Sequence, residues 1–161
     1  MESIKLENKE NLPVVTETIN AEALKSLIWK GEHFPQDNRF LSIEKGGVFK
    51  YFDPSEVLEN SEKKYYSLIK IGYKVIGLSE LEKVPESDNT VWLKFLSIDK
   101  DYQGQGYASK LAEEIFIFVK KEGFILEGSS YSDEGYEKLK STLNRLASKY
   151  DVEFIDKGKL N

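Results

Sequence analysis

Cysteine is absent from the 161 residues of this chain. A disulfide, a thiolate metal site and a cysteine nucleophile are therefore excluded. Histidine is nearly absent as well, because His33 is the only one. A histidine-based zinc site or a serine hydrolase triad would have to use it, and no Gly-x-Ser-x-Gly sequence accompanies it. We interpret His33 as a loop residue and expect no bound metal.

Long apolar runs are missing too, and none reaches the roughly 18 residues that a membrane-spanning helix needs. The first residues, "MESIKLENKENLP", are too charged for a secretion signal. We therefore expect a cytoplasmic protein without a membrane partner. The length favours one domain over residues 13–161, preceded by a flexible polar arm over residues 1–12.

Basic residues are outnumbered, because the chain has 23 Lys and Arg residues but 28 Asp and Glu residues, which gives a formal net charge of −5. Nucleic-acid-binding proteins usually carry a basic surface stripe, so we expect no nucleic-acid partner. Hydrophobic residues make up 40% of the chain and charged residues 32%. This composition is typical of a folded globular domain.

What the chain does contain is a succession of strand and helix patterns. We predict strands over 13–19, 89–98, 124–130 and 152–155, hairpins over 40–52 and 65–81, and helices over 21–30, from 53, over 109–121 and over 132–150. Asn20 is expected to cap the first of these helices and Gly123 to end the third. This order predicts one mixed α/β or α+β sheet with helices on its faces.

Two finer patterns accompany these elements. In the strand over 89–98, Val91, Leu93 and Phe95 alternate with Trp92, Lys94 and Leu96, so each set is expected to share one face of the sheet. In the helix over 132–150, the apolar residues recur at helical spacing and predict a buried stripe. The residues of that stripe are Tyr136, Leu139, Leu143 and Leu146.

The stretch "DKDYQGQGYASKL", residues 99–111, places two glycines just before an amphipathic helix. It is not a Walker loop, because Gly106 is followed by Tyr107 and Ala108 instead of Lys and Ser or Thr. It is not a dinucleotide fingerprint either, because Ile98 lies too far before Gly104 for a tight strand-to-helix turn. Backbone N–H groups of residues 104–109 would instead point outward at a positive helix end, which can bind a phosphate.

Within this stretch, Gln103-x-x-Gly106-x-Ala108 resembles the Gln/Arg-x-x-Gly-x-Gly/Ala signature of the GNAT superfamily of N-acetyltransferases. The preceding "WLKFLSIDKDY" looks like that family's fourth strand, and "SKLAEEIFIFVKK" like its pyrophosphate-binding helix. The hairpin "YSLIKIGYKVIGLSEL" is similar to its second and third strands. The resemblance covers residues 65–140 well and residues 13–64 poorly. It implies a single mixed, mostly antiparallel sheet, flanked by helices and splayed between strands four and five.

The resemblance also implies a cosubstrate, acetyl-CoA, and the residues that hold it. Backbone groups at the end of the fourth strand would bind the pantetheine arm, and one N–H would polarise the thioester carbonyl. Amides of the glycine loop would hold the pyrophosphate. The implied cofactor-binding residues are Leu96, Ser97, Ile98, Gln103, Gly104, Gln105, Gly106, Tyr107, Ala108 and Ser109.

The implied catalytic residues are Tyr136 and Glu80. Tyr136 lies in "GYEKL", which is similar to a stretch where family members carry the tyrosine that protonates the leaving thiolate. The same residue also fits the buried stripe, and Tyr131 is a rival for the acid. Where some members carry a glutamate base, this chain has Trp92, so Glu80 is the nearest alternative. Glu82, Asp88 or a water relay are further options.

The implied activity is transfer of an acetyl group from acetyl-CoA to a primary amine, by direct attack in a ternary complex. The alternative is a non-catalytic binding module on the same fold that acts through a protein partner. The acceptor is expected to be a small-molecule or peptide amine, and the acidic residues Glu32, Asp37 and Glu80 favour a cationic one. The resemblance also makes a homodimer an open prediction.

Overall fold

The structure is a computed structural model that describes residues 12–27, 61–72, 74–128 and 133–156, the helical residues 133–138 by their backbone alone. In chain order its elements are β1 (Val14–Asn20), α2 (Ala21–Leu27), the short 3-10 helix η2 (Ser61–Lys63), β2 (Lys64–Ile71), β3 (Lys74–Lys83), β4 (Thr90–Ile98), the 3-10 helix η3 (Lys100–Tyr102), α3 (Tyr107–Glu122), β5 (Ile125–Gly128), α4 (Asp133–Tyr150) and β6 (Phe154–Asp156). The predicted hairpin over 40–52, the helix from 53 and His33 lie outside the described residues. The other predicted strands and helices are confirmed where the described residues cover them, and residues 28–30 and 129–130 of two of them lie outside that part of the chain.

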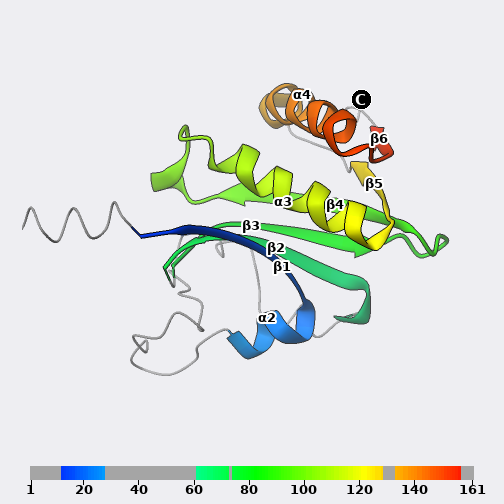
Figure 1. Cartoon of the computed structure of the whole chain (residues 1–161), viewed down its shortest axis with the longest axis horizontal. Helices are drawn as coiled ribbons and strands as arrows, with labels where there is room; N and C mark the ends of the chain where they lie inside the picture. The colour runs from blue at the N-terminus through cyan, green and yellow to red at the C-terminus, as the bar shows by residue number, and fades with distance from the viewer. Residues whose placement is uncertain (1–11, 28–60, 73, 129–132, 157–161) are drawn as a thin grey trace, which may run out of the picture.

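The described strands form one six-stranded sheet in the order β1-β2-β3-β4-β5-β6. Strands β1 to β4 pair antiparallel, whereas β4 with β5 and β5 with β6 pair parallel. Helix α2 covers one face of the sheet, and α3 and α4 lie on the other (Figure 1). The mixed, mostly antiparallel sheet expected from the resemblance is therefore confirmed. None of the helices in the described segments is long and apolar enough to span a membrane.

Strand β5 accompanies β4 over only part of its length. Ile125 pairs with Thr90 at one end of this ladder, and Gly128 pairs with Leu93 at the other. Strand β4 continues through residues 94–98 with β3 as its described neighbour. The sheet thus splays between β4 and β5, as the resemblance implied.

A bulge in β4 marks the point of separation. Phe95 pairs with Glu80 and Leu93 pairs with Leu81, so Lys94 is the extra residue between the two pairs. The bulge reverses the side-chain alternation beyond it. Leu93 packs in the core beneath α3, whereas Phe95 packs against the core beneath α2. The expectation that Phe95 shares a face with Val91 and Leu93 is therefore wrong.

Local signals fix the ends of several elements. The Asn20 side chain accepts a hydrogen bond from the Ala23 N–H at 2.8 Å, as predicted for a helix cap. Gly123 ends α3 in the left-handed region with φ of 74°, and its N–H bonds to the Lys120 carbonyl. Gly72, in the β2–β3 turn, has φ of 61°. The helix boundaries predicted at Asn20 and Gly123 are therefore confirmed.

Helix α4 packs on α3 through the predicted stripe. Leu143 and Leu146 are fully buried, and Leu139 is partly buried against the same core. At the far end of the pair, the Lys149 ammonium donates to a Glu113 carboxylate oxygen at 3.3 Å. Hydrogen bonds from the Tyr150 hydroxyl and from Lys149 hold the pKa of Glu113 below its ordinary value. The two helices are therefore joined at the surface as well as in the core.

Gly77 in β3 packs beneath Leu111 of α3. A Cβ built there would lie 2.5 Å from Ile69 Cγ2, 2.7 Å from Ile98 Cδ1 and 3.3 Å from Leu111 Cδ2. Two positions along the same strand, the Ser79 hydroxyl is buried and has no hydrogen-bond partner among the described residues. Substitution by alanine is therefore expected to affect the free energy of unfolding differently at Gly77 and at Ser79.

We predict that Gly77→Ala lowers the free energy of unfolding by about 1–3 kcal/mol, because the stiff, buried Ile69 must shift. The matched control is Ser79→Ala, which removes an unpaired hydroxyl and should change stability by less than about 1 kcal/mol or raise it. Urea unfolding followed by circular dichroism measures both. Equal stability of Gly77→Ala and the wild type would contradict the packing described here.

Candidate functional site

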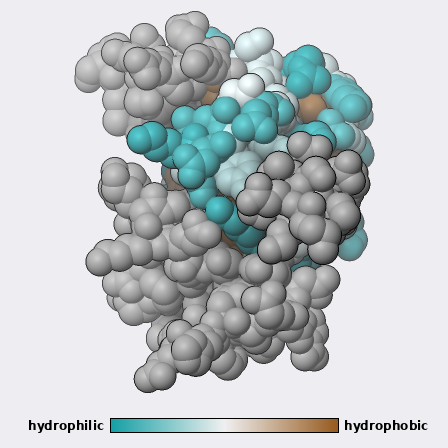
Figure 2. All heavy atoms as spheres, turned by 90° about the vertical axis from the view of Figure 1, so that its left-hand side faces the viewer, coloured by the Kyte–Doolittle hydropathy of each residue, from teal (hydrophilic) through white to brown (hydrophobic). Residues whose placement is uncertain are grey.

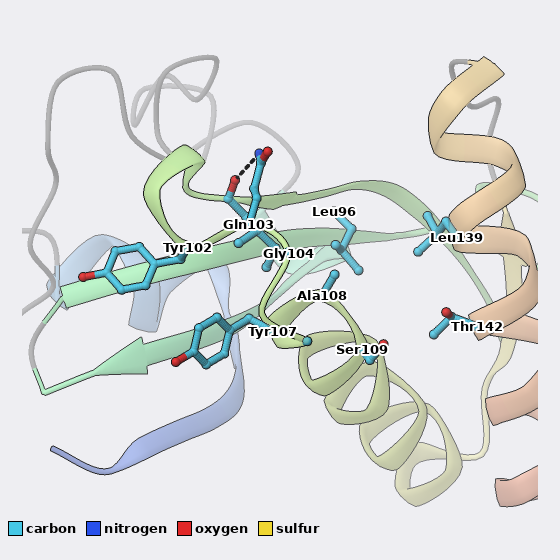
Figure 3. A pocket seen from close by; sticks show the side chains of 11 residues that line it. Leu96, Tyr102, Gln103, Gly104, Tyr107, Ala108, Ser109, Leu139 and Thr142 are labelled. Atoms are coloured by element: carbon cyan, nitrogen blue, oxygen red, sulfur yellow. Dashed lines mark hydrogen bonds between the residues drawn. The ribbon is translucent and has the colours of Figure 1, made fainter. Parts of the chain in front are cut away.

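A pocket of about 420 Å³ lies where β4 ends and α3 begins. Figure 2 views this end of the molecule, and most of its described surface is hydrophilic. The pocket wall comes from β4, the loop that follows it, the first turn of α3 and the middle of α4 (Figure 3). Its lining residues are Leu96, Ile98, Tyr102, Gln103, Gly104, Gly106, Tyr107, Ala108, Ser109, Leu139 and Thr142.

Most of the cofactor-binding residues expected from the resemblance meet in this one pocket. The exceptions are Ser97 and Gln105, which do not line it. Three lining residues were not expected as site residues, namely Tyr102 of η3 and Leu139 and Thr142 of α4. Leu139 carried a signal only as a member of the buried stripe, and Thr142 follows it by three positions, so both occupy one face of α4.

The strand side of the pocket offers backbone groups. The Asp99 N–H bonds to the Ile76 carbonyl on β3 at 2.7 Å. Because backbone groups of an antiparallel strand alternate in direction, Ser97 also points its groups to β3, whereas Leu96 and Ile98 point theirs away from it. No described strand pairs with β4 on that side along residues 94–98. The pocket therefore contains a strand edge that an extended ligand can pair with.

The loop after β4 is tied to the end of the strand. Gln103 Nε2 donates to the Ile98 carbonyl at 3.0 Å, the bond that Figure 3 draws as a dashed line. The Asp99 carboxylate accepts a hydrogen bond from the Asp101 N–H at 3.1 Å, and the Tyr102 N–H bonds to the Asp99 carbonyl at 2.8 Å. These bonds set the direction in which the chain enters the two glycines.

The helix side of the pocket offers the start of α3. Gly104 and Gly106 have φ of 77° and 83°, a left-handed conformation that favours glycine. No protein atom of the described segments lies within 4 Å of a Cβ built at either position. Gly106 caps α3 without a side-chain hydrogen bond, and the first turn has no acidic residue. The first N–H groups of the helix, with its positive dipole end, therefore face open space.

Glu80 lies on the other face of the sheet, level with the β4 bulge. It pairs with Phe95, and its Oε1 accepts a hydrogen bond from the Tyr66 hydroxyl at 2.8 Å. Tyr66 is fully buried beneath α2. Glu82, two residues along, forms a 3.7 Å ion pair with Lys94. Glu80 is thus held by a rigid donor where β4 leaves β5.

Tyr136, the other expected catalytic residue, belongs to the first turn of α4. Its side chain lies outside the described residues, and so does the rival Tyr131. Its backbone lies one turn before Leu139, which lines the pocket. Asp88 is exposed in the turn before β4, at the opposite end of that strand from the pocket. The structure therefore places Glu80, but not Asp88, near the splay.

Three solved structures illustrate the fold that the chain shares. An aminoglycoside acetyltransferase from an uncultured soil metagenomic sample, in complex with sisomicin, is 18% identical with a TM-score of 0.55, covering 85% of this chain and 89% of its own. The ribosomal-protein-S18-alanine N-acetyltransferase of Escherichia coli is 16% identical with a TM-score of 0.52, covering 81% and 76%. A GNAT family acetyltransferase from Elizabethkingia anophelis with acetyl-CoA bound is 17% identical with a TM-score of 0.50, covering 80% and 72%.

No curated protein sequence matches the chain. The sequence does match the family model described as the acetyltransferase (GNAT) family, over residues 23–135. This match includes β2 to β5, the glycine loop and all of α3. The splayed sheet and the pocket at the start of α3 agree with it, and the chain belongs to the GNAT acetyltransferase family.

Proposed function

We propose that this protein transfers an acetyl group from acetyl-CoA to a primary amine. The observation that carries the proposal is the pocket itself, which joins an edge of β4 that has no partner strand among the described residues to an open helix N-terminus. An extended arm with an amide backbone suits the strand edge, and a diphosphate suits the helix end. Acetyl-CoA has both groups in one molecule, because its pantetheine arm is joined directly to its pyrophosphate.

Leu96 and Ile98 would pair with the pantetheine arm, because their backbone groups point away from β3. The Leu96 N–H is our candidate for polarising the thioester carbonyl. The hydrogen bond from Gln103 to the Ile98 carbonyl would hold the end of the strand in place. Beyond it, the amides from Gly104 to Ser109 would hold the pyrophosphate. The role of Ser97 would be limited to pairing with β3.

Glu80 is proposed as the base. Its carboxylate would take the proton that the amine loses as nitrogen bonds to the acetyl carbon, while the carbon–sulfur bond breaks and the thiolate takes a proton from Tyr136. The Tyr66 hydroxyl would orient Glu80 throughout. Glu80 lies on the α2 face of the sheet, and the pocket lies on the other side. The two would approach each other near the bulge at Lys94, where β4 separates from β5.

The acceptor is proposed to be a cationic amine. Glu80 and Glu82 stand on the same face of β3, and the sequence adds Glu32 and Asp37 in a segment outside the described residues. Acidic side chains attract an ammonium group and can exclude anionic competitors. Relatives in fold carry names that refer to an aminoglycoside and to a protein alanine as acceptors, so both small-molecule and peptide amines remain proposals.

The first test concerns the donor. Gly106→Glu should abolish acetyl-CoA binding, because a carboxylate would fill the open space at the helix N-terminus and repel the pyrophosphate. Gly123→Glu is the matched control, since Gly123 ends the same helix with a similar φ and equally open surroundings. Isothermal titration calorimetry measures both. Absence of acetyl-CoA binding by the wild type would overturn the proposed function.

The second test concerns the base. Glu80→Gln should lower kcat about 10²- to 10⁴-fold, the usual contribution of a general base, and leave the Kd for acetyl-CoA unchanged. Glu82→Gln removes the neighbouring carboxylate and should have a much smaller effect. A thiol-release assay over a panel of polyamines, aminoglycosides and peptides supplies the rates. A Glu80→Gln variant with wild-type kcat would exclude this residue as the base.

The third test concerns the acid and separates an enzyme from a binding module. Tyr136→Phe should slow thiol release about 10²-fold or more, because the leaving thiolate would lose its proton donor. Stability measured by urea unfolding should change little, because the ring is retained. A large loss of stability with normal kcat would instead assign Tyr136 to the buried stripe. No amine-dependent thiol release from wild type would favour the module.

A further inference from the structure

A chain of hydrogen bonds joins α3 to the first two strands of the sheet. The Glu114 carboxylate of α3 accepts from two threonine hydroxyls of β1, at Oε1 from Thr16 over 3.2 Å and at Oε2 from Thr18 over 2.9 Å. The Thr18 hydroxyl oxygen also lies 2.7 Å from the hydroxyl oxygen of Ser67 in β2. We call Thr16, Thr18, Ser67 and Glu114 the hydroxyl clamp.

The hydrogens of the clamp all point toward the carboxylate. A hydroxyl has a single hydrogen, and Thr18 donates its own to Glu114. Ser67 is therefore the donor in its contact with Thr18. Ser67 is fully buried, whereas the two threonines and Glu114 are half-buried. Each hydroxyl of the clamp thus has an acceptor, and hydrogen bonds to a carboxylate are roughly twice as strong as those between neutral groups.

The clamp restrains α3 along the direction of β1. Thr16 and Thr18 are two positions apart on one strand, so they share a face and lie roughly 7 Å from each other along it. Because each carboxylate oxygen bonds to a different threonine, a shift of the helix along β1 stretches one bond or the other. The hydrophobic effect is non-directional. The clamp therefore adds a directional restraint to the packing of Leu111 and Ile115 against the sheet.

The clamp belongs to the same cross-strand row as one wall of the pocket. Thr18 pairs with Ser67, Ser67 pairs with Ser79, and Ser79 pairs with Leu96, so the row crosses β1, β2, β3 and β4. Leu96 lines the pocket, and Glu114 lies about two turns from the start of α3. The clamp therefore holds the helix against the row that ends at the open edge of β4.

We propose that the hydroxyl clamp positions the start of α3 relative to the edge of β4 and thereby sets the affinity for acetyl-CoA. This inference rests on the proposed function, in which one ligand pairs with the strand edge and also reaches the helix N-terminus. Such a ligand binds best when these two parts already have the right spacing, because binding then requires no movement of the helix. None of the four clamp residues lines the pocket, so they are positioning residues that act through α3.

The test separates the hydroxyl groups from the shape of the side chains. Thr16→Val/Thr18→Val keeps the branched shape and removes both donors to Glu114, so it should raise the Kd for acetyl-CoA about five- to tenfold in isothermal titration calorimetry. Thr16→Ser/Thr18→Ser keeps the hydroxyls and should bind within about twofold of the wild type. A loss of stability alone does not change this Kd while the variant stays folded, which circular dichroism checks.

Ser79→Ala is the matched control. It removes a hydroxyl from the same cross-strand row, but one without a hydrogen-bond partner among the described residues, so the wild-type Kd should be kept. If the double valine variant does not fold, Thr16→Val alone spares the bond between Thr18 and Ser67. This single variant should raise the Kd about threefold, and wild-type affinity in it would contradict the inference.

The remaining outcomes separate the inference from the proposed function. Wild-type affinity in a folded double valine variant would overturn the inference and leave the proposed function in place. An equal loss of affinity in the double serine variant, or in Ser79→Ala, would also overturn it, because the hydroxyl bonds to Glu114 would not be the cause. If the wild type does not bind acetyl-CoA, both the inference and the proposed function fail.

Discussion

The separation of β4 from β5 is the constraint on which the rest of this structure depends. Once β5 ends beside Leu93, the backbone of β4 has a described neighbour on one side only. Buried or half-buried backbone N–H and C=O groups require hydrogen-bond partners. At a strand edge inside a pocket, a ligand can supply them. The bulge at Lys94 lies at the same level and turns Phe95 toward α2. The separation thus leaves a strand edge in the pocket, and the bulge sets which side chains face each layer.

The two faces of the sheet divide the proposed chemistry between them. On the α3 face, the glycine loop and the first turn of the helix surround the pocket, and the bond from Gln103 to the Ile98 carbonyl fixes their position relative to the strand. On the α2 face, Glu80 stands opposite Phe95 beside the bulge. A donor held on one side and a base held on the other can meet only where the strands part, so the splay would determine where the acetyl group is transferred.

Much of this could be predicted from sequence, because local signals decide it. Asn20 and Gly123 act through their own side-chain or backbone chemistry, and the Gln-x-x-Gly-x-Ala loop is a contiguous motif. The bulge could not be predicted, because register is a property of two strands and the alternation around Phe95 looks regular in one. The contribution of Thr142 to the pocket depends on how α4 docks, and the bond from Tyr66 to Glu80 joins residues on different strands. The homodimer and the cytoplasmic location stay predictions.

Tyr66 links the core to the proposed chemistry. Its ring is fully buried with Leu24 and Leu68 beneath α2, and its hydroxyl orients Glu80. The Tyr66 side chain thus has two roles, packing in the core and hydrogen bonding to Glu80. A change that repacks this layer also displaces the hydroxyl oxygen that bonds to the carboxylate. Substitutions in the α2 layer would therefore also move Glu80, the proposed base, unless they preserve the position of the Tyr66 hydroxyl as well as the volume of the core.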